Sequence, residues 1–456
     1  PAHVGARHRM TDLRRSPLLV PALTMSVATV GATMFAISPL LPDIARAHDV
    51  TIARAGTMQA AFSVALAVAA PIVGLGAQRV PRVHLIVAAL CVYALAWIGA
   101  GQSTRFEALL ALSALAGAAS GTALPAIYAY AADLADPANR AHLMGRVVSG
   151  WSVAVLLVVP LMSLAAHVID WRWAFGGLSV SALLMAGLLV RAPRPAGPVQ
   201  PESAAQARAQ AQSQSQSQSQ SQSQSQSQSQ APGQAPVPTG PGAPAPAGGV
   251  LYSLVRVLGD GGMRRILAAN LLDMGAFYAV YAYLGSELRR LNDWGPTPAG
   301  LTIAVYGAGL AVVTFNARLI DRLGMRRTAI GALLLLVVVL AILPWLASVP
   351  AAMAVGMFTW GCVQGAFFVS ATALAADRIP ALRGVATALL GSSTYVGVSL
   401  LTPVGTGVFE RFGYGAVGVL SAASCLLAAG LLWGLEMPGA SSDSGTGRAR
   451  DDGSAG

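Results

Sequence analysis

The chain has 456 residues, of which 55% are hydrophobic and only 11% are charged, whereas about 25% of the residues in a typical soluble domain are charged. With a mean hydropathy of +0.60, this composition excludes a soluble enzyme, a fibrous protein and a wholly disordered chain, and it favours a helical membrane protein with several spans. The net charge of +10 comes from arginine alone. Because these arginines form no basic stripe with interleaved aromatic residues, we expect no nucleic-acid partner.

The first 17 residues are polar and contain several arginines, and we predict that they form an N-terminal tail. The chain begins with proline, which indicates either removal of an initiator methionine or a true start at Met10. The apolar run that follows is too long for a signal peptide and does not end in a small-residue cleavage site. We therefore interpret it as a retained first span.

Twelve runs in the sequence are long and apolar enough to span a membrane, for which a helix needs about 20 residues. They are too long and too uniformly apolar for barrel strands. We predict an all-α membrane protein of twelve transmembrane helices in two six-helix halves, 18–191 and 263–436. The predicted spans are 18–41, 56–77, 83–101, 107–131, 142–167, 174–191, 264–285, 299–318, 328–347, 351–374, 384–409 and 415–436.

Arginine placement predicts the orientation of these spans. If the N-terminus is cytoplasmic, twenty-two of the 29 arginines fall on the cytoplasmic side, as the positive-inside rule expects. We therefore predict a multi-pass protein of the bacterial inner membrane, with both termini and the C-terminal tail 437–456 in the cytoplasm.

A different kind of sequence separates the two halves. Residues 212–230 alternate glutamine and serine, and residues 231–249 are rich in proline, glycine and alanine. Period-two alternation can indicate a strand, but neither residue type is apolar, so no face could be buried. We predict that residues 192–262 form a disordered cytoplasmic linker. A glutamine-rich interaction or aggregation tract is the alternative.

Two loops lie at matching positions in the halves, which indicates a duplicated six-span unit. A second pair of similar segments, around Asp170 and Glu410, lies at nearly the same distance from these loops. The loop after the second span contains Gly74, Gln78 and Arg79, and the loop after the eighth span contains Ala317, Asp321, Arg322, Gly324, Arg326 and Arg327.

The second of these loops resembles the signature Gly-xxx-Asp-Arg-x-Gly-Arg-Arg of the major facilitator superfamily, with Ala317 at the first glycine. The first-half loop departs more, with Gln78 at the aspartate and Pro81 at the later glycine. The resemblance covers nearly all of the chain outside the tails and the linker. It implies the major facilitator fold, whose halves rock about a midplane site, and a conformational latch formed by the nine loop residues named above. Plain positive-inside charge is the alternative for the arginines.

The fifth span bears on the branch of this family. It keeps Pro160 of the motif Gly-Pro-x-x-Gly-Gly of drug:proton antiporters but has other residues at the glycines, and Ser113 stands where that branch has an arginine. The segments around Tyr281 and Asp170 resemble bacterial sugar-efflux and drug-efflux permeases. The resemblance therefore favours export.

Asp273 is an ionisable residue well inside a predicted span, because it follows Arg264 by about nine residues, or roughly 13 Å of helix. An aspartate at mid-helix costs about 2.5–3.5 kcal/mol on insertion scales, so it is a functional candidate by default. We predict that Asp273 is the proton-coupling residue. The alternative is a carboxyl group neutralised by a neighbouring hydroxyl or amide, without a role in transport.

Helical spacing places several polar and aromatic residues on the same face of the seventh span as Asp273. The family resemblance implies that the first, fourth, seventh and tenth spans line the substrate cavity. Ordinary helix packing is the alternative, and for Thr29 it is equally favoured. The predicted cavity residues are Thr29, Tyr128, Asn270, Phe277, Tyr281, Trp360 and Gln364.

The sequence has no nucleotide-binding loop, no metal-ligand spacing and no Ser–His–Asp arrangement, so we predict no enzyme activity, cofactor or metal. We predict a monomeric secondary transporter in the lipid bilayer that exports a small organic molecule in exchange for protons by alternating access. The expected substrates are a drug-like compound, a siderophore or other secreted metabolite, or a sugar. A proton-coupled importer is one alternative, and a transporter-like sensor or assembly protein without flux is another.

Overall fold

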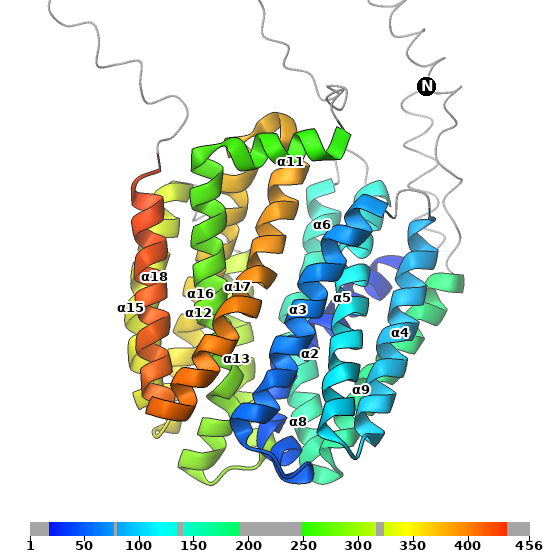
Figure 1. The fold of residues 1–456 in the computed structure, drawn as a ribbon, viewed down its shortest axis with the longest axis vertical. Coiled ribbons are helices and arrows are strands. Elements are labelled where there is room, and N and C mark those ends of the chain that lie inside the picture. The colour runs from blue at the N-terminus through cyan, green and yellow to red at the C-terminus, as the bar shows by residue number, and fades with distance from the viewer. Residues whose placement is uncertain (1–17, 77–79, 135–139, 192–248, 316–322, 436–456) are drawn as a thin grey trace, which may run out of the picture. The chain divides into compact units, whose positions relative to one another are not determined.

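The computed structural model describes residues 18–76, 80–134, 140–191, 249–315 and 323–435. Within these ranges every regular element is a helix, and twelve helical segments are long and apolar enough to cross a membrane. The predicted all-α fold with twelve spans is therefore confirmed. Figure 1 shows the first half, from blue to blue-green, beside the second half, from green to red.

The first half contains an interrupted fifth span. One turn of π-helix, η2, lies in its middle, and Pro160 is the second residue after it. Proline has no N–H to donate to the preceding turn, so the regular hydrogen-bond ladder is already weakened there. The elements of this half are α2 (Leu19–Ala47), α3 (Ile52–Gly76), α4 (Arg82–Gln102), α5 (Phe106–Leu134), α6 (Arg140–Val148), α7 (Gly150–Val153), η2 (Ala154–Val158), α8 (Val159–Val168) and α9 (Trp171–Arg191).

The second half contains six unbroken spans. Its elements are α12 (Gly261–Asn292), α13 (Pro296–Phe315), α15 (Met325–Leu346), α16 (Pro350–Arg378), the short turn η3 (Pro380–Leu382), α17 (Arg383–Phe412) and α18 (Tyr414–Trp433). The halves meet where α2 packs on α12, α3 on α17, and α8 on α13.

The packing of the helices repeats between the halves, as the duplicated loops predict. Helix α5 packs against α3 in the same way that α16 packs against α13. A Cβ atom at Gly117 would collide with the carbonyl oxygen of Phe62, and one at Gly361 would collide with that of Tyr306. The sequence spacing from Phe62 to Gly117 equals that from Tyr306 to Gly361. Each half therefore needs a glycine at the same place for its two helices to approach closely.

The structure differs from the predicted linker at its C-terminal end, where Gly249–Gly259 form helix α11 against α12 and α17 (Figure 1). Helix α11 packs there because it has an apolar side, on which Val257 is fully buried. Asp260 then caps α12: its carboxylate accepts the N–H of Met263 at 2.6 Å and pairs with Arg378 of α16 at 2.8 Å. The remainder of the predicted linker, 192–248, lies outside the described residues.

The spans define two ends of the bundle. We call the end where α2 and α12 begin, beside α11, the α11 end. We call the opposite end, where both helices stop, the Arg289 end. Asp273, Phe277 and Tyr281 lie in that order along α12 between the two ends.

Candidate functional site

Asp273 is fully buried and is held by two side chains from neighbouring helices. The amide nitrogen Nε2 of Gln364 on α16 donates to Asp273 Oδ2 at 2.6 Å. The thiol of Cys425 on α18 lies 3.9 Å from Asp273 Oδ1. Gln364 in turn accepts a hydrogen bond from the indole N–H of Trp360 at 3.3 Å. A carboxylate, an amide and an indole are therefore connected in series between α12 and α16.

An aromatic cluster lies next to this series, and we define it as Phe35, Trp151, Phe277, Tyr278, Tyr281, Tyr306 and Trp360. Phe277 is one helical turn from Asp273 and lies 4.8 Å from Trp360 between ring centroids. Phe277 also stacks on Tyr281 at 5.5 Å, with the rings 10° from parallel. These separations are typical of favourable aromatic pairs. The indole that touches Gln364 is therefore part of the cluster.

The cluster joins the two halves of the protein. Phe35 of α2 lies 5.2 Å from Tyr281 between ring centroids, and its carbonyl oxygen accepts the Tyr281 hydroxyl at 2.9 Å. Phe35 also meets Trp151 of α7 at 6.3 Å. The indole N–H of Trp151 donates to the Tyr128 hydroxyl at 2.8 Å. Tyr128 is thus connected to the cluster through Trp151.

Two of the predicted cavity residues, Thr29 and Asn270, do not belong to the aromatic cluster. The hydroxyl of Thr29 is 2.6 Å from that of Ser181 on α9, inside the first half. The amide nitrogen of Asn270 donates to Ser393 and Thr394 of α17, both at 2.9 Å. Both side chains connect helices within one half. This is the packing role that the sequence left open for Thr29.

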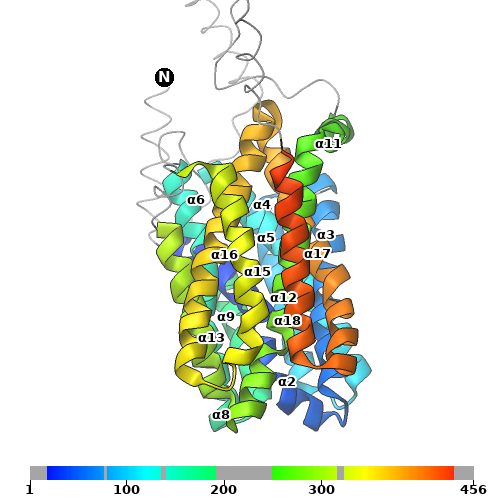
Figure 2. The same ribbon diagram turned by 90° about the vertical axis from the view of Figure 1, so that its left-hand side faces the viewer.

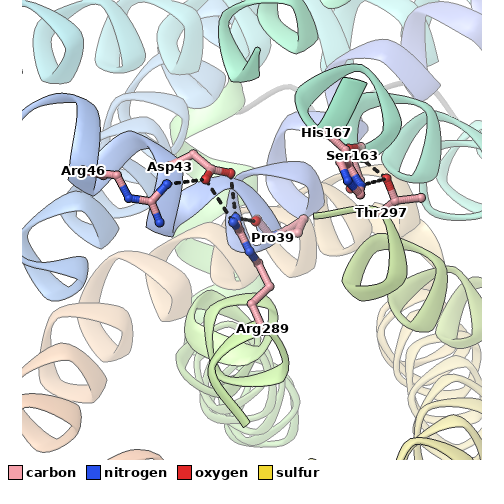
Figure 3. A network of polar contacts seen from close by, with 7 residues as sticks. All are labelled: Pro39, Asp43, Arg46, Ser163, His167, Arg289 and Thr297. Carbon is pink, nitrogen blue, oxygen red and sulfur yellow. Dashed lines mark hydrogen bonds and ion pairs between the residues drawn. The ribbon is translucent and has the colours of Figure 1, made fainter. Parts of the chain in front are cut away.

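A set of polar contacts joins the two halves at the Arg289 end. The guanidinium of Arg289 on α12 forms a bidentate pair with Asp43 on α2, at 2.6 and 2.9 Å, and also donates to the carbonyl oxygen of Pro39. Figure 3 shows Asp43 between Arg289 and Arg46. Bidentate pairs of this kind combine strength with a fixed geometry.

A second contact between the halves at this end joins α8 to α13. His167 Nδ1 lies 3.0 Å from the hydroxyl of Thr297, which also reaches the carbonyl oxygen of Ser163 (Figure 3). Nearer the cluster, the Ser38 hydroxyl donates to the carbonyl oxygen of Tyr281 and accepts the N–H of Gly285. Polar contacts thus bridge the halves from the aromatic cluster to the Arg289 end.

A cavity of about 10 Å³ lies between the cluster and the Arg289 end, among α2, α3 and α12. This volume suits a single water molecule. Its walls include Ser38, Gln59 and Tyr281. Gln59 is 4% exposed, and its amide nitrogen donates to the sulfur of Met34, which is a weak acceptor.

The predicted latch residues are only partly described. Gly74 lies within α3, whereas Gln78, Arg79, Ala317, Asp321 and Arg322 lie outside the described residues. Gly324 is the N-cap residue just before α15, with φ at +84°, in the left-handed region that favours glycine. Arg326 donates to the carbonyl oxygens of Leu432 and Trp433 at the end of α18, in its own half, and Arg327 is exposed. The latch therefore stays a prediction.

Sequence reasoning missed several members of the site. Phe35, Trp151, Tyr278 and Tyr306 complete the cluster, and Cys425 lies beside Asp273. The available signal for Tyr278 was its position next to Phe277. For the others the sequence offers none, because a single aromatic residue or cysteine is common in an apolar helix.

Twelve spans in two equivalent halves, with a buried carboxylate beside the contact between them, define a polytopic secondary transporter. The model of the Major Facilitator Superfamily matches residues 23–257 and 266–452. The chain belongs to this superfamily.

Individual relatives agree with this assignment. An uncharacterized MFS-type transporter of Bacillus subtilis, YwfA, is 27% identical over 410 residues, covering 90% of both chains. The inner membrane transport protein YdhP of Escherichia coli is 22% identical over 76% of both chains. A chloramphenicol resistance protein of Streptomyces lividans is 32% identical over 168 residues, which are 37% of this chain and 43% of that protein.

Proposed function

We propose that the protein is a proton-coupled exporter of a small amphiphilic organic molecule. The observation that carries this proposal is the series Asp273–Gln364–Trp360, which connects a buried carboxylate to the aromatic cluster. When Asp273 is ionised, it accepts from the Gln364 amide. When it is protonated on Oδ2, that oxygen presents a proton to the Gln364 N–H, so the amide and the attached indole would have to turn or move away. Proton binding is thereby coupled to the wall that a substrate would touch.

The composition of this wall limits the substrate. Aromatic rings supply large apolar contacts, and the hydroxyls of the tyrosines supply hydrogen bonds. Asp273 brings a negative charge when ionised, and the seven side chains of the cluster are neutral. These features favour neutral or cationic amphiphiles over anions such as phosphate. The name of the Streptomyces lividans relative makes chloramphenicol, a neutral aromatic amphiphile, the first compound to test.

We further propose that the Arg289 end is the outer end in the bacterial inner membrane and that the protein works as a monomer. Its two inter-half contacts would then hold the outer side closed, and alternating access would require them to separate. The arginine distribution supports cytoplasmic placement of the α11 end and of both termini. A reporter fused after Gly456 tests this orientation, because activity on the periplasmic side would contradict it.

The transport proposal is tested in everted vesicles from cells that express the chain, with an imposed gradient that is acidic inside. We expect radiolabelled chloramphenicol, or a cationic amphiphile such as ethidium, to accumulate, and a protonophore to stop the accumulation. Vesicles from cells that carry the empty vector are the control. Accumulation only in right-side-out vesicles would identify an importer instead. Absence of flux in both orientations across a panel of amphiphiles would indicate a sensor or assembly protein.

A further inference from the structure

A groove lies on the outer face of the second half, between α15 and α16, with a volume of about 510 Å³. Figure 2 shows these two helices side by side on the face turned to the viewer. Leu334, Leu335 and Val338 of α15 are 43 to 50% exposed on this side of the bundle. Since the helices span a membrane, the groove opens toward lipid acyl chains.

Small residues create the groove. Gly331 and Ala332 of α15 face Ala366 of α16, where larger side chains would fill the space. A Cβ atom on Gly331 would meet no heavy atom within 4 Å. The lining from Arg327 to Leu335 covers roughly 12 Å of helix. The groove can therefore hold part of one acyl chain along two turns of α15.

One end of the groove is positively charged. Arg327 and Thr328, in the first turn of α15, line that end. The neighbouring Arg326 is turned to the end of α18 and donates there to two carbonyl oxygens, so the two adjacent arginines have different surroundings. Gly324 offers no side chain to cap α15. The N–H groups of the first turn therefore add partial positive charge next to Arg327.

We propose that this groove is a binding site for one anionic phospholipid. The Arg327 guanidinium and the first turn of α15 bind the lipid phosphate, and one acyl chain lies over Gly331 and Ala332. The apolar floor selects a lipid rather than free phosphate, and the charged end selects an anionic headgroup. Basic pockets at the ends of membrane helices bind such headgroups by the same combination of charge and apolar contact.

Native mass spectrometry of the purified full-length protein tests the site. Phosphatidylglycerol and phosphatidylcholine with identical acyl chains are added separately after delipidation. We expect phosphatidylglycerol to bind about fivefold more tightly, as one arginine near a headgroup provides. Arg327→Gln should abolish this preference, and Gly331→Leu should weaken the binding of both lipids by filling the groove. Gly430→Leu is the matched control, because Gly430 is also exposed on a span with open space around its Cβ atom.

Equal binding of the two lipids, or an unchanged preference in Arg327→Gln, would overturn the proposal. A second measurement on the wild-type protein does not depend on any variant. Cys362 lines the groove, whereas Cys91 is similarly half-buried on α4 of the other half. Phosphatidylglycerol should slow maleimide alkylation of Cys362 and leave that of Cys91 unchanged. Equal rates at Cys362 with and without the lipid would also contradict the site.

Discussion

The two halves share a packing plan but differ at the position of Asp273. The shift in sequence that relates the two glycine contacts also relates Thr29 to Asp273, and Ser120 to Gln364. In the first half, the Thr29 hydroxyl lies beside that of Ser181, and Ser120 donates to a carbonyl oxygen of its own helix. In the second half, the equivalent places hold a carboxylate and an amide that bond to each other at 2.6 Å.

This difference shows how a duplicated unit can divide two tasks. The hydroxyls of Thr29 and Ser120 are neutral and find their hydrogen bonds within the first half, so this half buries no charge at these places. The carboxyl group in the second half is a buried charge whenever it is ionised, and such groups cost free energy and are retained where a function needs them. The proposed proton coupling therefore lies in the second half, and the first half contributes Phe35 and Trp151 to the shared cluster.

The largest effect is expected when the charge itself is removed. Asp273→Asn should reduce proton-driven transport in everted vesicles to the vector background, because an amide cannot bind and release the proton. Thr29→Val, at the equivalent place in the first half, should keep most of the transport. Protein levels in the membrane are compared for both variants. Equal loss in the two variants would show that the halves do not divide the tasks in this way.

A smaller effect, on stability, should be shared by the halves. Gly117→Val and Gly361→Val each force a side chain against a backbone carbonyl. Such overpacking costs about 1–3 kcal/mol. Both variants should therefore lower the thermal unfolding midpoint of the purified protein. Gly430→Ala, at an open position, is the control. A loss for one glycine and not the other would weaken the equivalence of the two packing contacts.

Replacing the amide beside Asp273 should reduce transport, but by less than the change Asp273→Asn does. Gln364→Leu removes the donor at 2.6 Å, and an unsatisfied buried group costs about 1–3 kcal/mol. Transport should therefore fall about tenfold and its dependence on pH should shift. Ser120→Ala is the matched change in the first half and should be nearly silent, because Ser120 bonds only within its own helix in the described contacts. An unchanged pH profile in Gln364→Leu would show that the Gln364 amide takes no part in proton coupling.

The smallest effect concerns Asp260, at the start of α12. The hydrogen bonds from Arg378 hold the pKa of the Asp260 carboxyl below its ordinary value, although burial opposes this. A lowered pKa stabilises the folded state above the unfolded value, near 4, and this contribution is lost as the pH falls through the folded value. The thermal unfolding midpoint of Asp260→Asn should therefore be lower than that of the wild-type protein at pH 7. The difference between the two should shrink below about pH 4.

The first half provides a control for this ion pair. Asp133 pairs with Arg82, but their side chains are 56% and 43% exposed, against 29% for Asp260 and 18% for Arg378. Exposed pairs contribute little. Asp133→Asn should therefore change the melting temperature less than Asp260→Asn. The reverse order would show that burial does not decide the strength of these pairs.

The sequence predicted the spans well because twenty apolar residues are a sufficient local signal. It named Asp273, Gln364 and Trp360 but could not predict their contacts, which depend on how α12 and α16 pack. Asn270 was grouped with Asp273 because both lie on one broad face of α12. In the structure, however, Asn270 donates hydrogen bonds to α17, whereas Asp273 accepts one from Gln364 of α16. Helix α11 was missed because its apolar run is too short for a span and directly follows a low-complexity tract.

The π-turn in the fifth span has a consequence for the register of that helix. Above it, Trp151 points to Phe35 and Tyr128 inside the first half, while below it His167 reaches Thr297 of the second half. One residue more or less rotates the following helix by about 100°. The wide turn Ala154–Val158 therefore sets the rotation of the helix after it relative to the helix before it. Because a π-turn holds one residue more than an α-turn, deleting one residue from it can be absorbed by a return to α-helical geometry, whereas inserting a residue in the regular helix that follows would turn His167 away from Thr297.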